Sequence, residues 1–129
     1  MSQRDLFEFF MGGGLERGEG QSRPVWHPPT DVYEVEGGAV ITVEVAGMAG
    51  GEFNLIVQGR TLVITGRRHG TDQKQSYRQM EIHYGEFRSE IEFPWHVDVE
   101  SIETSYNDGF FRVILKRSEP KRIPVRSLD

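Results

Sequence analysis

The four histidines and the 20 aspartate and glutamate residues are the side chains of this chain that could bind a metal ion. The spacing that brings two imidazoles to one metal, H-x-H or H-E-x-x-H, does not occur among His27, His69, His83 and His96. Glu81 and His83 lie two residues apart, so a strand would place both on one face. Such a pair is more typical of a solvated surface than of a metal site. We therefore predict no metal site.

Catalysis is the second chemistry to consider. Asp98 and Glu100 also share a strand face, but a catalytic carboxylate pair needs a cleft that the surrounding sequence does not indicate. No serine lies in a G-x-S-x-G frame. The glycine run 12–14 lacks the G-x-x-x-x-G-K-[ST] pattern of a phosphate-binding loop. We predict that the chain is not an enzyme and binds no cofactor.

Ile123, Pro124 and Val125 indicate a different kind of chemistry, the burial of apolar surface. They lie in a charged tail, eight residues beyond Leu115, the last residue of a strand-like run. Pro124 fixes its own φ and pushes Ile123 into an extended conformation. Ile123 and Val125 then point to one side as a pair of apolar knobs. We predict that they fit a groove beside a sheet edge, most simply on another copy of the chain.

Residues 1–24 form an N-terminal arm. Ser2 and Asp5 have the spacing of a capping box, and Gly12 ends any helix that follows. About ten residues of helix are marginally stable alone, so the large apolar side chains of the arm need shelter. These side chains are Leu6, Phe7, Phe9, Phe10 and Met11. They could dock on their own domain, pack between subunits or contact foreign unfolded chains.

The central region, residues 25–115, has the pattern of a β-rich domain. No proline occurs between Thr30 and Phe93, as the interior of a sheet requires. Three two-residue signals predict tight antiparallel hairpins: Gly37-Gly38, Gly59-Arg60 and Asp108-Gly109.

Apolar residues alternate with polar ones along these runs. Ile41, Val43 and Val45 share one face, as do Phe111, Val113 and Leu115. Phe53, Leu55 and Val57 form a third such set, and Phe87, Ile91 and Phe93 a fourth. Short alternating strands at this spacing predict an all-β fold, an immunoglobulin-like antiparallel β-sandwich. Phe110 and Ile114 point the other way, either into a second core or along an exposed groove.

The stretch from Ser76 to Tyr84 follows a polar interruption and regains extended character. Tyr77, Met80, Ile82 and Tyr84 are its large apolar residues. The stretch could pair within the domain or reach out to a partner.

Composition limits the partners and the setting. The chain has 129 residues and a formal charge of −5, but residues 112–129 carry a net charge of +4. An acidic body argues against nucleic acid as the main partner, and a basic tail suits contacts between subunits. The absence of cysteine excludes disulfides, and no apolar run approaches the ~18 residues of a membrane span. Because the N-terminus lacks the pattern of a secretion signal, we expect a cytoplasmic protein.

Five motifs, in order, give the chain a resemblance to the small heat-shock proteins, the α-crystallin-domain family. Trp26–Glu34 is similar to the W-x-P-x-x-D-x-x-E opening, and Gly59–Gly66 to the G-N-x-L-x-I-x-G stretch. Tyr84–Pro94 resembles Y-G-x-F-x-R-x-F-x-L-P, and Tyr106–Phe111 occupies the place of x-x-N-G-V-L. The tail triplet matches I-x-I/V. Together these motifs span roughly residues 25–125.

The chain departs from the family pattern at several positions. Ala46 stands where the family has proline before a loop glycine, and Phe110 and Phe111 replace valine and leucine. The family arginine of the Y-G-x-F segment falls on Ser89. Arg88 is next door, but neighbouring strand residues point to opposite faces. A salt bridge built by that arginine is therefore not expected here.

The resemblance implies an ATP-independent holding chaperone, a homo-oligomer that binds partly unfolded client proteins. It implies an α-crystallin domain over residues 25–115 and a C-terminal extension over 116–129. It implies dimers made by exchange of the Ser76–Tyr84 strand and further assembly when the tail docks between two strands of a neighbour. The groove residues would be Phe53, Leu55, Val57, Ile102, Thr104 and Tyr106. The alternative is a β-sandwich adaptor, or co-chaperone module, that binds one folded partner.

Overall fold

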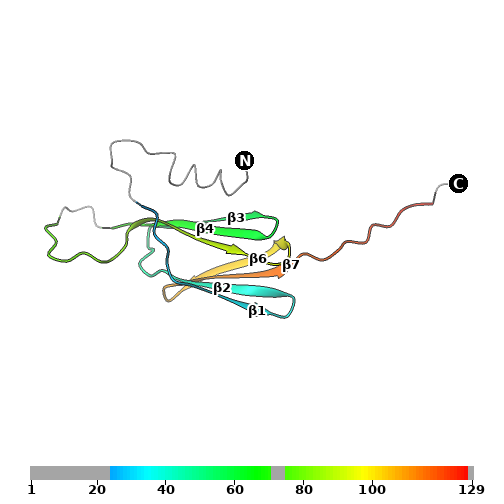
Figure 1. Ribbon diagram of the computed structural model, residues 1–129, viewed down its shortest axis with the longest axis horizontal. Coiled ribbons are helices and arrows are strands. Elements are labelled where there is room, and N and C mark those ends of the chain that lie inside the picture. The colour runs from blue at the N-terminus through cyan, green and yellow to red at the C-terminus, as the bar shows by residue number, and fades with distance from the viewer. Residues whose placement is uncertain (1–23, 71–74, 128–129) are drawn as a thin grey trace, which may run out of the picture.

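The computed structural model describes residues 24–70 and 75–127, and strands dominate this part of the chain (Figure 1). The predicted N-terminal helix and its apolar cluster lie outside the described residues. Seven strands follow one another within these described residues: β1 (Thr30–Val35), β2 (Gly38–Glu44), β3 (Glu52–Gln58), β4 (Thr61–Arg68), β5 (Gly85–Glu92), β6 (Val97–Asn107) and β7 (Phe110–Arg117). Strand β7 thus continues two residues past Leu115.

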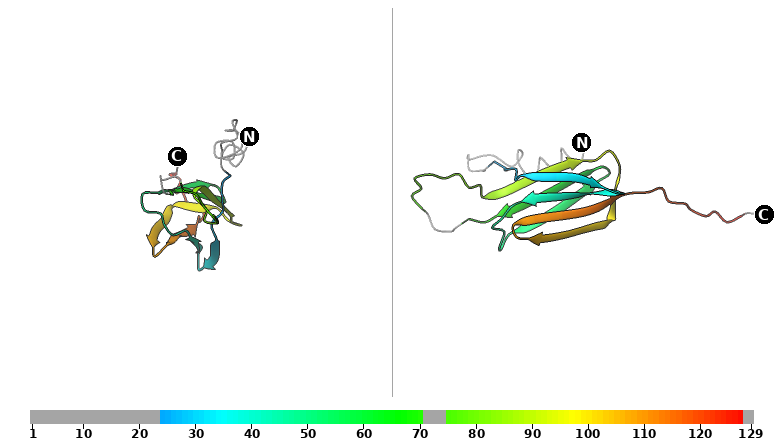
Figure 2. Two further views of the ribbon diagram at one scale, coloured as in Figure 1. Left: turned by 90° about the vertical axis from the view of Figure 1, so that its left-hand side faces the viewer. Right: turned by 90° about the horizontal axis from the view of Figure 1, so that it is seen from below.

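The strands form two sheets. One sheet has the order β1-β2-β7-β6 and the other β3-β4-β5, and every neighbouring pair is antiparallel. The sheets lie face to face, as the end-on view of Figure 2 shows. The structure confirms the predicted all-β sandwich.

Alternation along the strands places the core where the sequence pattern predicted it. Ile41 and Val43 of β2, Val113 of β7 and Leu62 and Ile64 of β4 have no exposed surface. The residues between them on β7, such as Phe110 and Ile114, are 42% and 37% exposed. Of the two alternatives for that face, the structure shows the exposed one. Burial of one face of each sheet supplies most of the driving force for folding.

Two of the three predicted hairpin turns are confirmed, and one shifts by a residue. Gly59-Arg60 joins β3 to β4, and Asp108-Gly109 joins β6 to β7. The β1–β2 turn is Glu36-Gly37 instead of Gly37-Gly38, because Val35 pairs with Gly38. Gly38 lies inside β2, where an added Cβ would collide with the carbonyl of Leu115. Its role is close packing against β7, which a turn signal does not distinguish.

Strand β6 contains an irregularity that the sequence did not reveal. Its register against β7 shifts between Asp98 and Glu103. Ser101 stabilises this bulge, because its hydroxyl donates a hydrogen bond to the Asp98 carbonyl at 2.7 Å and accepts one from the Lys116 amide at 2.9 Å. A bulge bends its strand and increases the local twist. The regular part of β6 therefore begins near the residues predicted to line the groove.

Gly66 provides a test of how the core is packed. It lies between Phe53 and Phe87 in the register of the β3-β4-β5 sheet. An alanine Cβ there would lie 2.6 Å from the Glu52 carbonyl and closer still to the Phe87 ring. We expect Gly66→Ala to lower the free energy of unfolding by about 1–3 kcal/mol, measured by urea unfolding at one protein concentration.

Gly70→Ala is the matched control for this substitution. An added Cβ at Gly70 meets the side chain of Tyr84 at 3.3 Å, and Tyr84 can move. We expect a change of less than about 0.5 kcal/mol in the control. Equal unfolding midpoints for both variants would show that Gly66 is not a packing constraint.

Candidate docking groove and exchange segment

The candidate groove lies between two sheet edges. Strand β3 ends the three-stranded sheet, and β6 ends the four-stranded sheet. The rings of Phe53 and Tyr106 are 5.5 Å apart, so the two edges lie on the same side of the sandwich. An edge strand presents unpaired backbone groups, which an extended segment can bind by strand addition.

Four of the six predicted groove residues are half-buried apolar side chains, and Tyr106 is 41% exposed. Phe53, Leu55 and Val57 of β3 pack against the core but keep part of their surface exposed. Ile102 of β6 does the same from the other edge, and Thr104 is exposed. Phe53 and Tyr106 contact each other across the two edges, and Leu55, Val57 and Ile102 pack against the same core.

One end of the groove is built from aromatic rings. Phe53 stacks on Phe111 of β7 with centroids 4.0 Å apart and an interplanar angle of 5°. Tyr106 tilts against Phe53, and its hydroxyl donates to the Val45 carbonyl at 2.8 Å. This hydrogen bond satisfies the polar end of the tyrosine while its ring stays apolar surface.

The tail triplet is free in the described chain. Ile123 and Val125 are 77% and 86% exposed. Residues 118–127 extend away from one end of the sandwich (Figures 1 and 2). The tail thus carries exposed apolar side chains and does not cover the candidate groove of its own chain.

The predicted exchange segment projects from the opposite end of the sandwich (Figure 2). Residues 75–84 form no strand in the described chain, so pairing within the domain is not observed. Tyr77, Met80 and Ile82 are 52%, 57% and 62% exposed, whereas Tyr84 is half-buried. The apolar side chains of this segment therefore lie where a partner could cover them.

Arg68, the last residue of β4, fixes the base of this segment. Its guanidinium group donates from Nε to the His83 carbonyl at 2.9 Å and from Nη1 to the Ala46 carbonyl at 3.1 Å. It also lies over the Trp26 ring, 4.5 Å from the centroid. Arginine suits this place because its planar fork can bond two carbonyls and stack on a ring at the same time.

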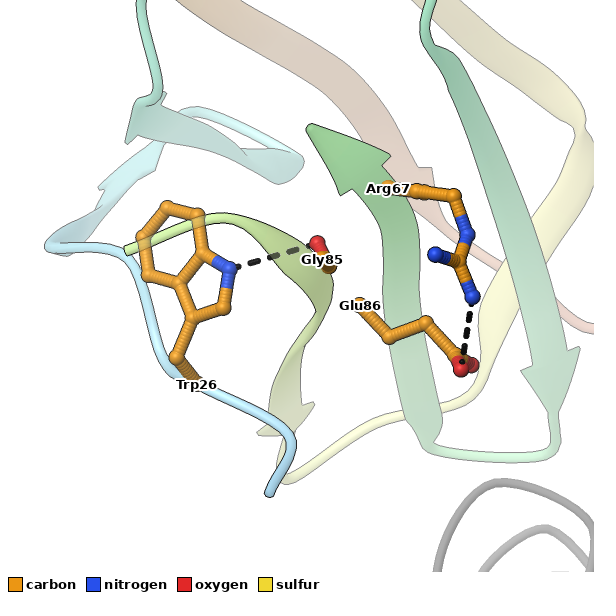
Figure 3. A network of polar contacts seen from close by, with 4 residues as sticks. All are labelled: Trp26, Arg67, Gly85 and Glu86. Atoms are coloured by element: carbon orange, nitrogen blue, oxygen red, sulfur yellow. Dashed lines mark hydrogen bonds and ion pairs between the residues drawn. The ribbon is translucent and has the colours of Figure 1, made fainter. Parts of the chain in front are cut away.

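Trp26 anchors the start of the domain. Its backbone pairs with β5, because its amide donates to the Glu86 carbonyl at 3.1 Å and its carbonyl accepts from the Arg88 amide at 2.9 Å. Its indole Nε1 donates to the Gly85 carbonyl at 3.3 Å (Figure 3). Beside it, Arg67 and Glu86 form an ion pair at 3.0 Å.

Ser89 points into the sandwich, where its hydroxyl lies 2.8 Å from that of Thr30. Arg88 lies on the opposite face of β5 and forms an ion pair with Glu90. The position of the family arginine thus holds a short neutral side chain with a partner inside its own chain. A salt bridge from this position is replaced by a hydrogen bond between hydroxyl groups.

The histidines and carboxylates considered for metal binding or catalysis make ordinary structural contacts. Asp98 Oδ1 accepts from the Glu100 amide at 3.1 Å, and His83 stacks on Trp26 with ring centroids 5.4 Å apart. Within residues 24–70 and 75–127, no group of three or more His, Asp or Glu side chains could hold a metal ion. In the same ranges, no helix is long and apolar enough to cross a membrane.

Comparison with known proteins identifies the family. The family model described as Hsp20/alpha crystallin family matches residues 31–129. This chain belongs to that family. Membership supports a chaperone role, and small heat-shock proteins are known as non-enzymatic chaperones.

The relatives of this Hsp20/alpha crystallin chain are distant. It is 27% identical over 97 residues to small heat shock protein C4 of Rickettsia felis, covering 74% of this chain and 60% of that protein. It is 29% identical over 112 residues to a 17.0 kDa class II heat shock protein of Zea mays, covering 84% and 73%.

Solved structures share the fold. A small heat-shock protein of Xylella fastidiosa matches with a TM-score of 0.62 and 22% identity over 81% of this chain and 100% of that one. Its crystal structure is described as revealing a distinct high order structure. The hspA protein of Xanthomonas axonopodis matches with a TM-score of 0.63 and 18% identity over 73% and 96%.

Sequence reasoning missed the role of Arg68. The pair Arg67-Arg68 ends a strand, and nothing in the residue pattern distinguishes the two side chains. The structure separates them, because Arg67 bonds Glu86 whereas Arg68 bonds two backbone carbonyls.

Removal of Arg68 should loosen the base of the exchange segment. In a Trp95→Phe background, where Trp26 is the one remaining tryptophan, we expect Arg68→Ala to increase acrylamide quenching of its fluorescence. Loss of charge-assisted hydrogen bonds should also lower the free energy of unfolding by about 1–2 kcal/mol. Arg67→Ala removes one exposed ion pair and should change quenching little. Quenching that rises equally in both variants would contradict the role of Arg68.

Proposed function

We propose that this chain is an ATP-independent holding chaperone that binds partly unfolded proteins through apolar surface and is regulated by reversible assembly. The observation that carries the proposal is the pairing, in one chain, of half-buried apolar side chains on β3 and β6, such as Phe53 and Ile102, with exposed apolar side chains in the tail, Ile123 and Val125. An adaptor for one folded partner needs no self-docking motif.

The first step of assembly is dimer formation through the exchange segment. Strand β1 is the other edge of the four-stranded sheet, and its Val32, Tyr33 and Val35 are 42%, 50% and 42% exposed. Residues 76–84 of a second copy, which bring Met80 and Ile82, would extend this sheet by strand addition. This would bury apolar surface from both chains.

The second step is docking of the tail in the groove of a neighbouring dimer. Burial of Ile123 and Val125 contributes about 1.5–3 kcal/mol each at most, and ordering of the tail offsets part of this. A single link should therefore have a dissociation constant in the millimolar to micromolar range. Several links in one particle add avidity, and each one still opens readily.

Opening of such links exposes the surfaces that clients would bind. The groove around Leu55 becomes free, and the N-terminal cluster of residues 6–11 offers further apolar side chains. Local order is lost on warming while apolar burial remains favourable, so exposure of these surfaces should increase under heat stress.

The chaperone activity can be tested directly. We expect the full chain, without ATP, to suppress heat-induced aggregation of two unrelated model proteins, followed by light scattering. An unrelated β-sandwich protein at equal mass concentration is the control and should not protect. Protection of neither protein would favour the adaptor alternative.

The tail link can be tested by Ile123→Ala combined with Val125→Ala. Because this removes most of the buried apolar surface of the plug, we expect the native mass to fall towards that of the dimer in size-exclusion light scattering. Ser118→Ala with Ser127→Ala alters the same tail outside the plug and should leave the mass unchanged. An unaltered mass in the first variant would show that the tail is not the link.

A further inference from the structure

The two strands that line the groove carry negative charge only. Neither β3 nor β6 contains a lysine or an arginine. Glu52 lies beside Phe53 at the aromatic end of the groove, and Glu103 lies between Ile102 and Thr104 on the opposite edge. Both glutamates are exposed. Strand alternation turns both side chains to the outer faces of their sheets, because Glu52 is opposite Arg67 and Glu103 is opposite Ile114, so carboxylates flank the apolar lining on its two sides.

The tail carries the opposite charge at matching places. Arg122 directly precedes Ile123, and Arg126 directly follows Val125. Between Glu119 and Asp129 the tail contains no acidic residue. In an extended segment, both arginines point away from the side that carries Ile123 and Val125. Their Cα atoms are about 13 Å apart, since each residue adds ~3.3 Å. They would therefore lie over the two ends of the groove when the plug is bound.

These charges are not neutralised within the described parts of the chain. No cation of residues 24–70 or 75–127 lies within 4.0 Å of a carboxylate oxygen of Glu52 or Glu103, nor is Arg122 or Arg126 in an ion pair there. Arg67 is opposite Glu52 in the β3–β4 pair, but it bonds Glu86 at 3.0 Å. Both sets of charges are thus available to a second copy of the chain.

We propose that Arg122 and Arg126 of one copy form ion pairs with Glu52 and Glu103 of another, and that this charge clamp makes the chain's own tail the preferred occupant of the groove. The inference rests on the proposed docking of the tail. The apolar knobs supply affinity, whereas the four charges discriminate against an apolar client segment that lacks flanking cations.

The clamp makes assembly depend on ionic strength. An exposed ion pair changes a dissociation constant by about two- to fivefold, and 0.5 M salt screens most of this effect. Several tails dock in one particle, so small effects multiply in the assembly equilibrium. A plug held by apolar contacts alone would keep its affinity, or gain some, as salt increases.

Charge reversal in the full chain tests the clamp. The tail variant is Arg122→Glu with Arg126→Glu, the groove variant is Glu52→Lys with Glu103→Lys, and a combined variant carries all four changes. In light scattering over a protein dilution series at 50 mM salt, we expect each single-sided variant to need at least about fivefold more protein for half-assembly. The combined variant should return to within about twofold of the unmodified chain.

The controls separate the clamp from other causes. Glu44→Lys with Glu92→Lys makes the same charge change as the groove variant at exposed positions of β2 and β5, outside β1 and the groove strands, and should leave assembly unchanged. Unfolding midpoints of all variants identify any loss of folding.

Two results would overturn the clamp. In the first, the single-sided variants assemble normally while the chain with Ile123→Ala and Val125→Ala dissociates. This result would reject the clamp but not the proposed docking of the tail. The other is a combined variant that fails to recover. Normal assembly of the alanine variant as well would reject the proposed docking itself.

Discussion

The stacking of Phe53 on Phe111 is the contact on which the groove depends. Phe53 belongs to the edge of one sheet and Phe111 to the neighbour of the edge strand in the other, so their contact holds β3 and β6 side by side. Gly66 leaves the space for this arrangement, since a side chain there would meet Phe87 and the β3 backbone. Tyr106 then covers the end of the pair. The arrangement of the candidate groove thus follows from aromatic packing between two sheets that do not share a hydrogen-bonded edge.

The two surfaces proposed for self-association lie on separate parts of the sandwich. The exchange segment and the tail leave from opposite ends (Figure 2). Their proposed receptors are also different edges, β1 for the segment and the β3–β6 groove for the tail. Dimer formation and tail docking therefore do not compete for one surface. In the proposed assembly, a particle would lose its tail contacts and remain dimeric, which is the kind of reversible assembly that a holding chaperone requires.

Much of the fold could be predicted because it depends on local patterns. Alternation in 41–45 and 111–115 correctly identified the buried faces, and Gly59-Arg60 and Asp108-Gly109 correctly placed two turns. The candidate groove residues were named as what the resemblance to a known family implies. The shifted β1–β2 turn and the β6 bulge could not be predicted, because each depends on close packing against β7.

By itself, the sequence determined which residues are apolar knobs, which strands alternate and how charge divides between body and tail. These properties follow from side-chain chemistry and from the two-residue period of a strand. The tertiary structure alone decided that β3 and β6 meet at one side, that Arg68 and not Arg67 holds the exchange segment, and that Ser89 finds its partner in Thr30. Each of these contacts joins residues far apart in the chain, so only the packing of the two sheets brings them within reach.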